Sequence, residues 1–258
     1  MDADTKDTIT ERQARIVEIV SQQGFATIDT LARDFGVSAQ SVRRDIIRLD
    51  TKGILQRFHG GVGVRETSVR LGYAEKRTVA TDAKTRIARK TAELIGEGAV
   101  VFLDVGTTVE AVAHALAEKR RLRVFTVSLA AAAILAGRPG IELFVFGGTV
   151  RSADGSLVGD VTLSSIARFR FDHAVIGFSG IDQNGELMDY DLEKVAVKEA
   201  AIRNAARTLA VGDSSKFRHP ATVRFTTPSH PVTIVTEARP APRLLEALAA
   251  HDLVLADA

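Results

Sequence analysis

Three segments in the first sixty residues repeat their apolar positions at helical spacing. They cover residues 10–24, 27–36 and 38–50, and each is bounded by polar capping residues or by glycine. The interval between the second and the third leaves room only for a tight turn. The inward stripe of the third segment consists of Val42, Ile46 and Leu49.

The polar face of segment 38–50 is basic and carries short hydrogen-bonding side chains. Ser38 precedes the helical pattern and is placed as its N-cap. Guanidinium forks and short polar groups are the side chains that reach base edges and phosphate oxygens in a major groove. Two short helices joined by a tight turn, the second of them basic, indicate a helix-turn-helix. The face comprises Gln40, Ser41, Arg43, Arg44 and Arg48.

Residues 53–62 alternate apolar and polar positions and approach two glycines, which predicts a β-hairpin, or wing. Arg57 and His59 lie on this hairpin and would extend toward a phosphate backbone. Residues 38–65 hold six cations against two carboxylates. The alternative is a three-helix fragment whose arginines are only solvated. The order of the three elements favours a DNA-binding domain over residues 1–62.

Residues 63–80 show little periodicity and are predicted to form a linker, after which strands and helices alternate through residues 81–258. Such alternation predicts an α/β domain with a mostly parallel sheet covered on both faces. The expected helices are 84–95, 109–118, 129–135, 162–168, 192–206 and 242–250. The expected strands are 99–103, 122–127, 141–146, 173–178, 208–211, 232–235 and 253–255.

Composition removes several classes of site. The 258 residues include no cysteine, which excludes disulfides, thiolate nucleophiles and zinc–thiolate centres. The six histidines are scattered without ligand spacing, and we expect no metal, no cofactor and no catalytic constellation. No apolar run approaches the roughly 18 residues of a membrane span, and the N-terminus is polar. We therefore expect a cytoplasmic protein without a membrane partner.

The first buried strand is followed by the turn 104–108, with the sequence DVGTT. Ligands of parallel α/β sheets bind at the carboxyl ends of the strands. Here Gly106 lets backbone amides approach an anion, Thr107 and Thr108 add hydroxyl donors, and a helix N-terminus follows. The turn lacks the spacing of a dinucleotide site and of a P-loop. It is either a phosphate cradle or a capped tight turn.

Other strand ends are polar as well, and each has a plain structural alternative such as capping or solvation. Several polar strand ends on one edge of a sheet suggest a small anionic polyol as the ligand. Asp104 begins the series, which continues with Ser128, Gly147, Gly148, Arg151, Asp191, Glu193, Lys198 and Lys216.

The N-terminal segment resembles the winged helix-turn-helix of the DeoR family of bacterial transcription regulators. The likeness includes SAQSVRRD in the basic segment and the HGG that ends the wing. The resemblance implies that residues 38–49 form the recognition helix. It also implies that Arg43 and Arg44 divide between base edges and phosphates, and that Asp45 orients an arginine.

The larger domain is similar to the DeoR effector domain, whose fold is shared with ribose-5-phosphate isomerase and glucosamine-6-phosphate deaminase. The stretches FLDVGTTVEAVAHAL, FGGTVRSADGSLVGD, IGFSGIDQNGELMDYDLEKVAVK and GDSSKF carry this resemblance. The resemblance implies that Asp191 and Glu193 meet ligand hydroxyls. The residues implied to hold the phosphate and order the pocket are Asp104, Gly106, Thr107, Thr108, Lys198 and Lys216.

The resemblance implies a repressor of a carbon-catabolic operon that binds double-stranded operator DNA as a homodimer or homotetramer. A small phosphorylated effector would relieve repression, with glycerol 3-phosphate as the first candidate and other sugar phosphates as alternatives. The rival interpretation is a sugar-phosphate isomerase or deaminase with an added DNA-binding head. Asp104, Glu193 and Lys216 are groups capable of acid–base chemistry, but no base–nucleophile arrangement supports that rival.

Overall fold

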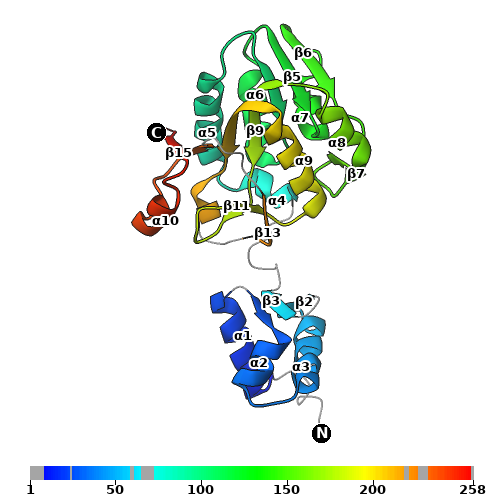
Figure 1. Cartoon of the computed structure of the whole chain (residues 1–258), viewed down its shortest axis with the longest axis vertical. Helices are drawn as coiled ribbons and strands as arrows, with labels where there is room; N and C mark the ends of the chain where they lie inside the picture. The colour runs from blue at the N-terminus through cyan, green and yellow to red at the C-terminus, as the bar shows by residue number, and fades with distance from the viewer. Residues whose placement is uncertain are drawn as a thin grey trace. The chain divides into compact units, whose positions relative to one another are not determined.

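The computed structural model describes residues 9–23, 25–58, 61–64, 73–217, 221–225 and 232–256 (Figure 1). The chain divides into two compact units, Met1–Gly72 and Tyr73–Ala258. Each unit has a hydrophobic core of its own, so each is a separate packing unit.

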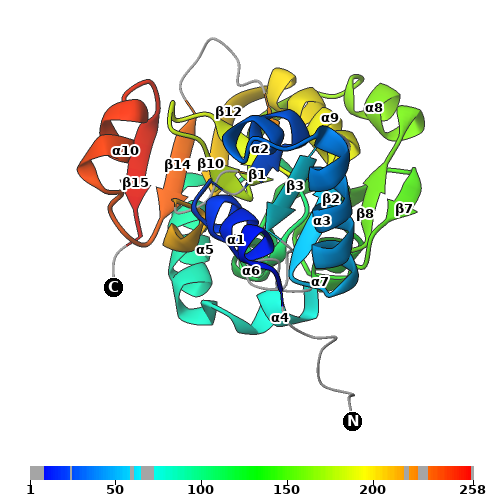
Figure 2. The same cartoon turned by 90° about the horizontal axis from the view of Figure 1, so that it is seen from below.

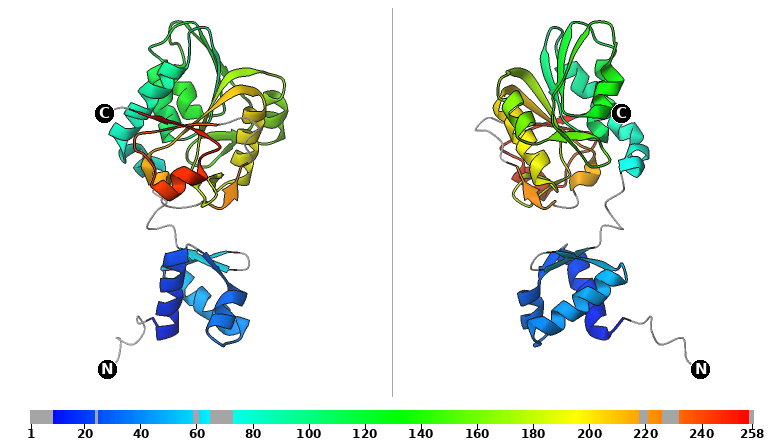
Figure 3. Two further views of the ribbon diagram at one scale, coloured as in Figure 1. Left: turned by 60° about the vertical axis from the view of Figure 1, so that its left-hand side comes forward. Right: turned by 90° about the vertical axis from the view of Figure 1, so that its right-hand side faces the viewer.

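The described residues of the first unit form three helices and an antiparallel sheet of strand order β1-β3-β2 (Figure 3). In chain order the elements are α1 (Glu11–Gln23), β1 (Phe25–Thr27), α2 (Ile28–Asp34), α3 (Ala39–Thr51), β2 (Leu55–Phe58) and β3 (Gly61–Val64). The helix-turn-helix and its wing, the β2–β3 hairpin, are therefore confirmed. The strand β1 was not predicted from the sequence, because three residues are too few to show a period.

Side-chain caps fix where the second and third helices of the first unit begin. The Thr27 hydroxyl accepts a hydrogen bond from the Thr30 amide at 3.1 Å, and the Ser38 hydroxyl accepts one from the Ser41 amide at 3.2 Å. Each cap gives a first-turn amide a side-chain acceptor at the start of its helix. The inward faces of the helices and strands meet in a core of Ile16, Val20, Ala26, Ile28, Leu31, Val42, Ile46, Leu49, Leu55 and Val62.

The second unit is built on a sheet of strand order β15-β14-β12-β9-β4-β5-β6, and every pairing within it is parallel. Its strands are β4 (Val100–Leu103), β5 (Leu122–Thr126), β6 (Ile141–Val145), β9 (Phe171–Gly177), β12 (Ala205–Val211), β14 (Thr233–Thr236) and β15 (Asp252–Leu255). Its helices are α4 (Tyr73–Thr78), α5 (Thr81–Leu94), α6 (Thr107–Leu116), α7 (Leu129–Leu135), α8 (Asp160–Ile166), α9 (Leu192–Arg203) and α10 (Pro242–Ala247).

Alternate residues of each central strand enter two different cores. On β4, Val101 and Leu103 pack with α5, α6 and α7, whereas Phe102 packs on the opposite face with α9. Figure 2 shows α5, α6 and α7 on one side of the sheet and α8 and α9 on the other. A parallel sheet covered on both faces has apolar strands without a polar side, which is the predicted α/β class.

Short antiparallel strand pairs lie beyond the carboxyl ends of the strands of this sheet. One is the hairpin of β7 (Thr149–Arg151) and β8 (Ser156–Val158). The other is a small sheet of β10 (Gly180–Ile181), β11 (Leu187–Asp189) and β13 (Val223–Arg224). Strands of two or three residues carry no measurable alternation, which is why the sequence did not predict them.

Several predicted boundaries differ from those observed. Residues 63 and 64 of the predicted linker belong to β3, and residues 73–78 form α4. The helix predicted over 192–206 ends at Arg203 with Asn204 as its C-cap, and Ala205 begins β12, because pairing with β9 overrides the helix propensity of alanine. Among the described residues, none of the helices has the length and apolar character needed to cross a membrane.

Candidate functional site

The outward face of α3 gathers most of the side chains predicted to touch DNA. Ser38 at the start of the helix is exposed and Ser41 is half-buried; their hydroxyl oxygens lie 3.0 Å apart within the cap. The described part of the chain offers no carboxylate partner to the three arginines on this face. The exposed face consists of Gln40, Arg43, Arg44, Ile47 and Arg48.

A buried carboxylate fixes α3 against α1. Asp45 is 3% exposed, and its two oxygens accept from Arg12 Nε at 2.6 Å and from Gln13 Nε2 at 2.9 Å. The carboxylate thus orients an arginine, Arg12 of α1, and does not project from the outward face. Two directed bonds between helices set the rotation of α3, and with it the direction in which the arginines project.

The wing residues are only partly described. Arg57 lies in β2 with its backbone opposite Val62 of β3, and His59 lies outside the described residues. Sequence reasoning missed Ile47, which is 46% exposed in the middle of the basic face. The signal was present, because position 47 lies four residues after Arg43 and so shares its side of the helix.

In the second unit, the predicted strand ends meet at one edge because the sheet is wholly parallel. Strands β4 and β9 are neighbours, yet β4 leads through α6 to β5 on one side, while β9 leads through α9 to β12 on the other. The strand order therefore reverses between β4 and β9. Ligand sites of open α/β sheets lie at such a reversal, outside the carboxyl ends of the strands.

A buried ion cluster lies where β4 and β9 end, at this reversal of the strand order. Lys198 of α9 is 1% exposed and donates to Asp104 Oδ2, to the Gly177 carbonyl at 2.9 Å and to Asp189 Oδ2, 3.2 Å away. Asp104, also 1% exposed, accepts a further bond from the Gly177 amide at 3.0 Å. All three hydrogens of the ammonium are engaged within the protein, so Lys198 ties the ends of β4, β9 and β11 together.

Asp104 and Asp189 share the ammonium of Lys198, and their pKa values shift in opposite directions. Burial raises the pKa of Asp104, although the neighbouring ammonium acts in the opposite direction. Burial opposes the shift of Asp189, but Lys198, the Tyr190 amide and the Ser179 hydroxyl together lower its pKa. The charges of both carboxylates raise the pKa of Lys198 despite its burial, so the lysine stays charged.

The turn after β4 places the N-terminus of α6 at the same edge of the sheet. Gly106 has φ 126°, a conformation that side chains rarely adopt, and it is the N-cap of α6 without a side-chain cap bond. Thr107 and Thr108 form the first turn of α6 rather than the loop before it. The first-turn amides of a helix lack intrahelical partners, which makes them available to an anion.

Arg151, Asp191 and Glu193 are brought together from two elements. Arg151 of the β7–β8 hairpin places Nε 2.6 Å from Asp191 Oδ2 and Nη1 2.5 Å from Glu193 Oε2. Asp191 is also the N-cap of α9 and accepts from the Glu193 amide at 3.0 Å. A second ion pair, between Asp154 and Lys194, holds the same hairpin to α9.

Three of the four remaining predicted positions have a visible structural role, and Lys216 is the exception. Ser128 is 1% exposed and caps α7 through the Ala131 amide at 3.1 Å. The Gly147 carbonyl accepts a hydrogen bond from Thr162 Oγ1 at 2.7 Å. A Cβ on Gly148 would lie 2.1 Å from Thr162 Oγ1, so this position has room only for glycine. Lys216 is half-buried in the short helix Ser214–Phe217, and no hydrogen bond or ion pair joins its ammonium to another described residue.

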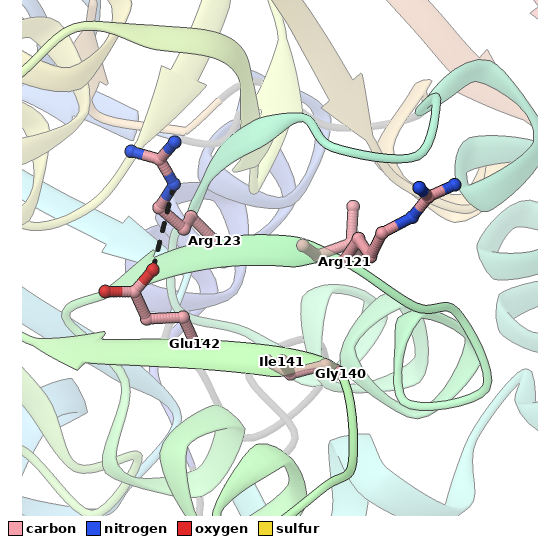
Figure 4. Close-up of a pocket in the computed structure, with 6 residues that line it drawn as sticks. Arg121, Arg123, Gly140, Ile141 and Glu142 are labelled. Carbon is pink, nitrogen blue, oxygen red and sulfur yellow. Dashed lines mark ion pairs between the residues drawn. The ribbon is translucent and has the colours of Figure 1, made fainter.

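A surface hollow of about 370 Å³ lies elsewhere, at the starts of β5 and β6 (Figure 4). Its Arg123 lies 3.7 Å from Glu142, and Arg121 contacts Glu97 at 2.6 Å. The starts of parallel strands are the edge opposite the strand ends described above. This hollow is therefore separate from the candidate site.

Comparisons with known proteins agree with both halves of this description. Residues 12–68 match the DeoR-like helix-turn-helix domain, and residues 79–238 match the DeoR C-terminal sensor domain. The glycerol-3-phosphate regulon repressor of Escherichia coli K12 is 37% identical over 246 residues, which cover 95% of this chain and 98% of that protein. The HTH-type transcriptional repressor CsqR of the same organism is 34% identical over 236 residues, covering 92% and 90%.

Among solved structures, ribose 5-phosphate isomerase A from Methanocaldococcus jannaschii is similar with a TM-score of 0.40 and 17% identity. The match covers 53% of this chain and 54% of that chain. A similarity this loose carries no conclusion about the activity of this chain.

Proposed function

The chain belongs to the DeoR family and is a DNA-binding transcriptional repressor rather than an enzyme, and on that premise we propose which surfaces bind its two partners. The exposed face of α3 binds double-stranded operator DNA. A small phosphorylated metabolite binds at the carboxyl edge of the large sheet and relieves repression of a carbon-catabolic operon.

The DNA proposal rests on the guanidinium groups of α3, which pair with no carboxylate among the described residues. Arg43 and Arg44 project from the exposed face and divide between base edges and phosphates, while Arg48 meets phosphate one turn later. Ile47 lies between them and suits the methyl group of a thymine. Arg57 and His59 on the wing contact the backbone beside the groove. Repeated half-sites require a homodimer or a homotetramer, which works in the cytoplasm where the operator lies.

The effector proposal rests on the free amides at the start of α6 beside the strand reversal. A phosphate accepts bonds from these amides and from the hydroxyls of Thr107 and Thr108. Lys216 and Arg151 supply positive charge, and Asp191 and Glu193 accept bonds from ligand hydroxyls. Asp104 and Lys198 form the buried ion pair beneath these groups and hold the strand ends that carry them in place.

Glycerol 3-phosphate is the first effector to test, because relatives that match 95% and 83% of this chain are named for its regulon. A three-carbon polyol with one phosphate also matches one cradle beside two carboxylates. Other sugar phosphates are the alternative.

The observation that carries the proposal is the outward face of α3, whose arginines meet no described carboxylate. The test begins with selection of bound sequences from a random 20-base-pair pool by the full chain. Fluorescence anisotropy then measures operator affinity with and without glycerol 3-phosphate, fructose 6-phosphate and ribose 5-phosphate. Sequence enrichment together with weaker binding in one of these ligands is the expected result.

Two variants locate the partners. Lys216→Ala should keep operator affinity and lose the effector response, whereas Lys90→Ala, on the outer part of α5, should keep both. A Lys216→Ala titration that matches the wild type would remove Lys216 from the effector site. No enrichment of any sequence by the wild-type chain would contradict the DNA proposal.

A further inference from the structure

Helix α4 is the first element of the second unit and starts at the boundary between the units. The first unit ends at Gly72 and α4 begins at Tyr73. The chain therefore enters the second unit at this helix, and a force transmitted along the chain from the first unit acts on α4 first. The bonds that hold α4 therefore act on the first described residues of the second unit.

The start of α4 is bonded to the first turn of α6. The Tyr73 hydroxyl donates to Glu110 Oε1 at 2.6 Å, and Arg77 Nε lies 3.8 Å from Glu110 Oε2. Glu110 is only 7% exposed and stands one turn after Gly106, at the N-terminus proposed to receive the phosphate. Burial, and then the bond and charge of Glu110, raise the pKa of Tyr73, so its hydroxyl remains a donor at all ordinary pH values.

The end of α4 is bonded to α5. Lys84 is 6% exposed, and its ammonium donates to the carbonyl of Lys76 and to the carbonyl of Val79, the latter at 2.6 Å. Among the described residues, no carboxylate lies within ion-pair distance of this ammonium. Burial lowers the pKa of Lys84, while the charges of Asp213 and Lys216 act on it from the turn after β12.

Both anchors of α4 therefore belong to residues that sense charge at the strand edge. An anion at the amides of α6 repels the buried carboxylate of Glu110 and attracts the buried ammonium of Lys84. Glu110 holds the side chains of Tyr73 and Arg77 of this six-residue helix, and Lys84 holds the carbonyls of Lys76 within it and of Val79 directly after it. Neither group has a solvated surface position from which water and salt would screen the change.

We propose that α4 is the coupling element of this repressor, and that Tyr73, Glu110 and Lys84 are positioning residues that link effector binding to operator affinity. The inference rests on the proposed function, because it takes the effector to be an anion at the N-terminus of α6. The three residues contact neither ligand. They set the placement of α4, the element with which the second unit begins.

The test separates coupling from binding. Operator affinity of the full chain is measured by anisotropy with and without saturating glycerol 3-phosphate, or whichever of fructose 6-phosphate and ribose 5-phosphate the wild type answers. Effector affinity is measured by titration calorimetry. Tyr73→Phe removes one hydroxyl and Lys84→Met removes one ammonium at nearly constant length. Lys90→Met on the same helix α5 is the matched control.

The expected result is that the effector changes the operator affinity of Tyr73→Phe and Lys84→Met by less than about 2-fold, against about 5- to 150-fold for a typical coupled protein. Both variants should bind effector and operator separately with wild-type affinity, and Lys90→Met should keep the full response. If Lys84→Met does not fold, Tyr73→Phe alone decides, because it leaves the packed ring in place.

Each other outcome contradicts a named statement. Full coupling in the variants of a responsive wild type would overturn the role of α4 and leave the proposed function standing. Loss of effector binding in Tyr73→Phe would place that residue in the ligand site and also overturn the coupling role. A wild-type chain that answers none of the three ligands would overturn the proposed effector function, and this inference with it.

Discussion

The basic groups of the two candidate surfaces are held in opposite ways. Arg43, Arg44 and Arg48 project from α3 without a carboxylate partner among the described residues. At the edge of the large sheet, Lys198 contacts two carboxylates, and so does Arg151. The surface on α3 meets a polyanion without breaking any internal ion pair. At the sheet edge, Arg151 has to exchange internal partners for those of a ligand.

This difference teaches where stability and binding are separable. On α3 the groups that fix the helix, such as Asp45, are buried, and the groups that bind are exposed. At the sheet edge, Arg151, Asp191 and Glu193 are paired with one another and are also proposed to meet the ligand. Substitutions at the edge should therefore change folding and ligand response together, and substitutions on α3 should change binding alone.

The largest effect should come from Lys198→Met, which leaves Asp104 and Asp189 buried without their shared cation. Removing one member of a buried ion pair costs about 3–5 kcal/mol of unfolding free energy. Urea unfolding followed by circular dichroism measures it. Lys194→Met, which breaks the more exposed pair with Asp154, is the control and should cost about 1 kcal/mol. Equal costs would erase the distinction between the buried cluster and the hairpin.

The next effect should be Arg44→Ala, with a loss of about 1–3 kcal/mol in specific operator binding and almost none in stability. The side chain is exposed and touches no described carboxylate, so folding does not depend on it. Anisotropy at fixed salt measures the binding, and a urea melt measures the stability. Arg33→Ala, an exposed arginine of α2, is the matched control. Unchanged operator affinity in Arg44→Ala would rule out its base contact.

A smaller effect should follow Ser38→Ala, because the Ser38 hydroxyl caps the helix that carries the binding face. Loss of such a cap costs about 1 kcal/mol of stability. Thr27→Ala removes the corresponding cap of α2 and should cost a similar amount of unfolding free energy. Only Ser38→Ala should also weaken operator binding. If both variants weakened it equally, the cap of α3 would have no special part in presenting the arginines.

The smallest effect should be the loss of one charge in Asp191→Asn, which keeps an N-cap acceptor for α9. Burial opposes the shift, but the bond from Arg151 and the amide bonds lower the pKa of Asp191 below its ordinary 3.8. A lowered pKa means that the carboxylate stabilises the folded state at neutral pH. That contribution is lost as the pH falls through the folded pKa, below about 4. In urea unfolding, the variant should therefore unfold slightly more easily than wild type at pH 7, and the difference should shrink as the pH falls through the folded pKa of Asp191.

Sequence reasoning predicted the repeated patterns and missed what three-dimensional packing decides. The parallel strands of the second unit form clear apolar runs, and the helices of the first unit have clear periods and clear caps, such as Thr27 and Ser38. The edge of the sheet could be predicted because parallel strands end together. The pairing at that edge could not, since Lys198 finds Asp104 94 positions away in the chain. Exposed Ile47 and the bonds of α4 also depend on neighbours that no local pattern specifies.

The strand order of the large sheet has a consequence for synthesis of the chain. All elements of the first unit lie within residues 11–64, and their pairings are short in sequence. Strand β4 lies at residues 100–103 but pairs with β9 at 171–177, and β12 gains β14 only at 233–236. Pairings across long separations form late. During synthesis on the ribosome, the DNA-binding unit is therefore complete long before the effector-binding unit. A truncated chain would contain the DNA-binding unit without the unit that regulates it.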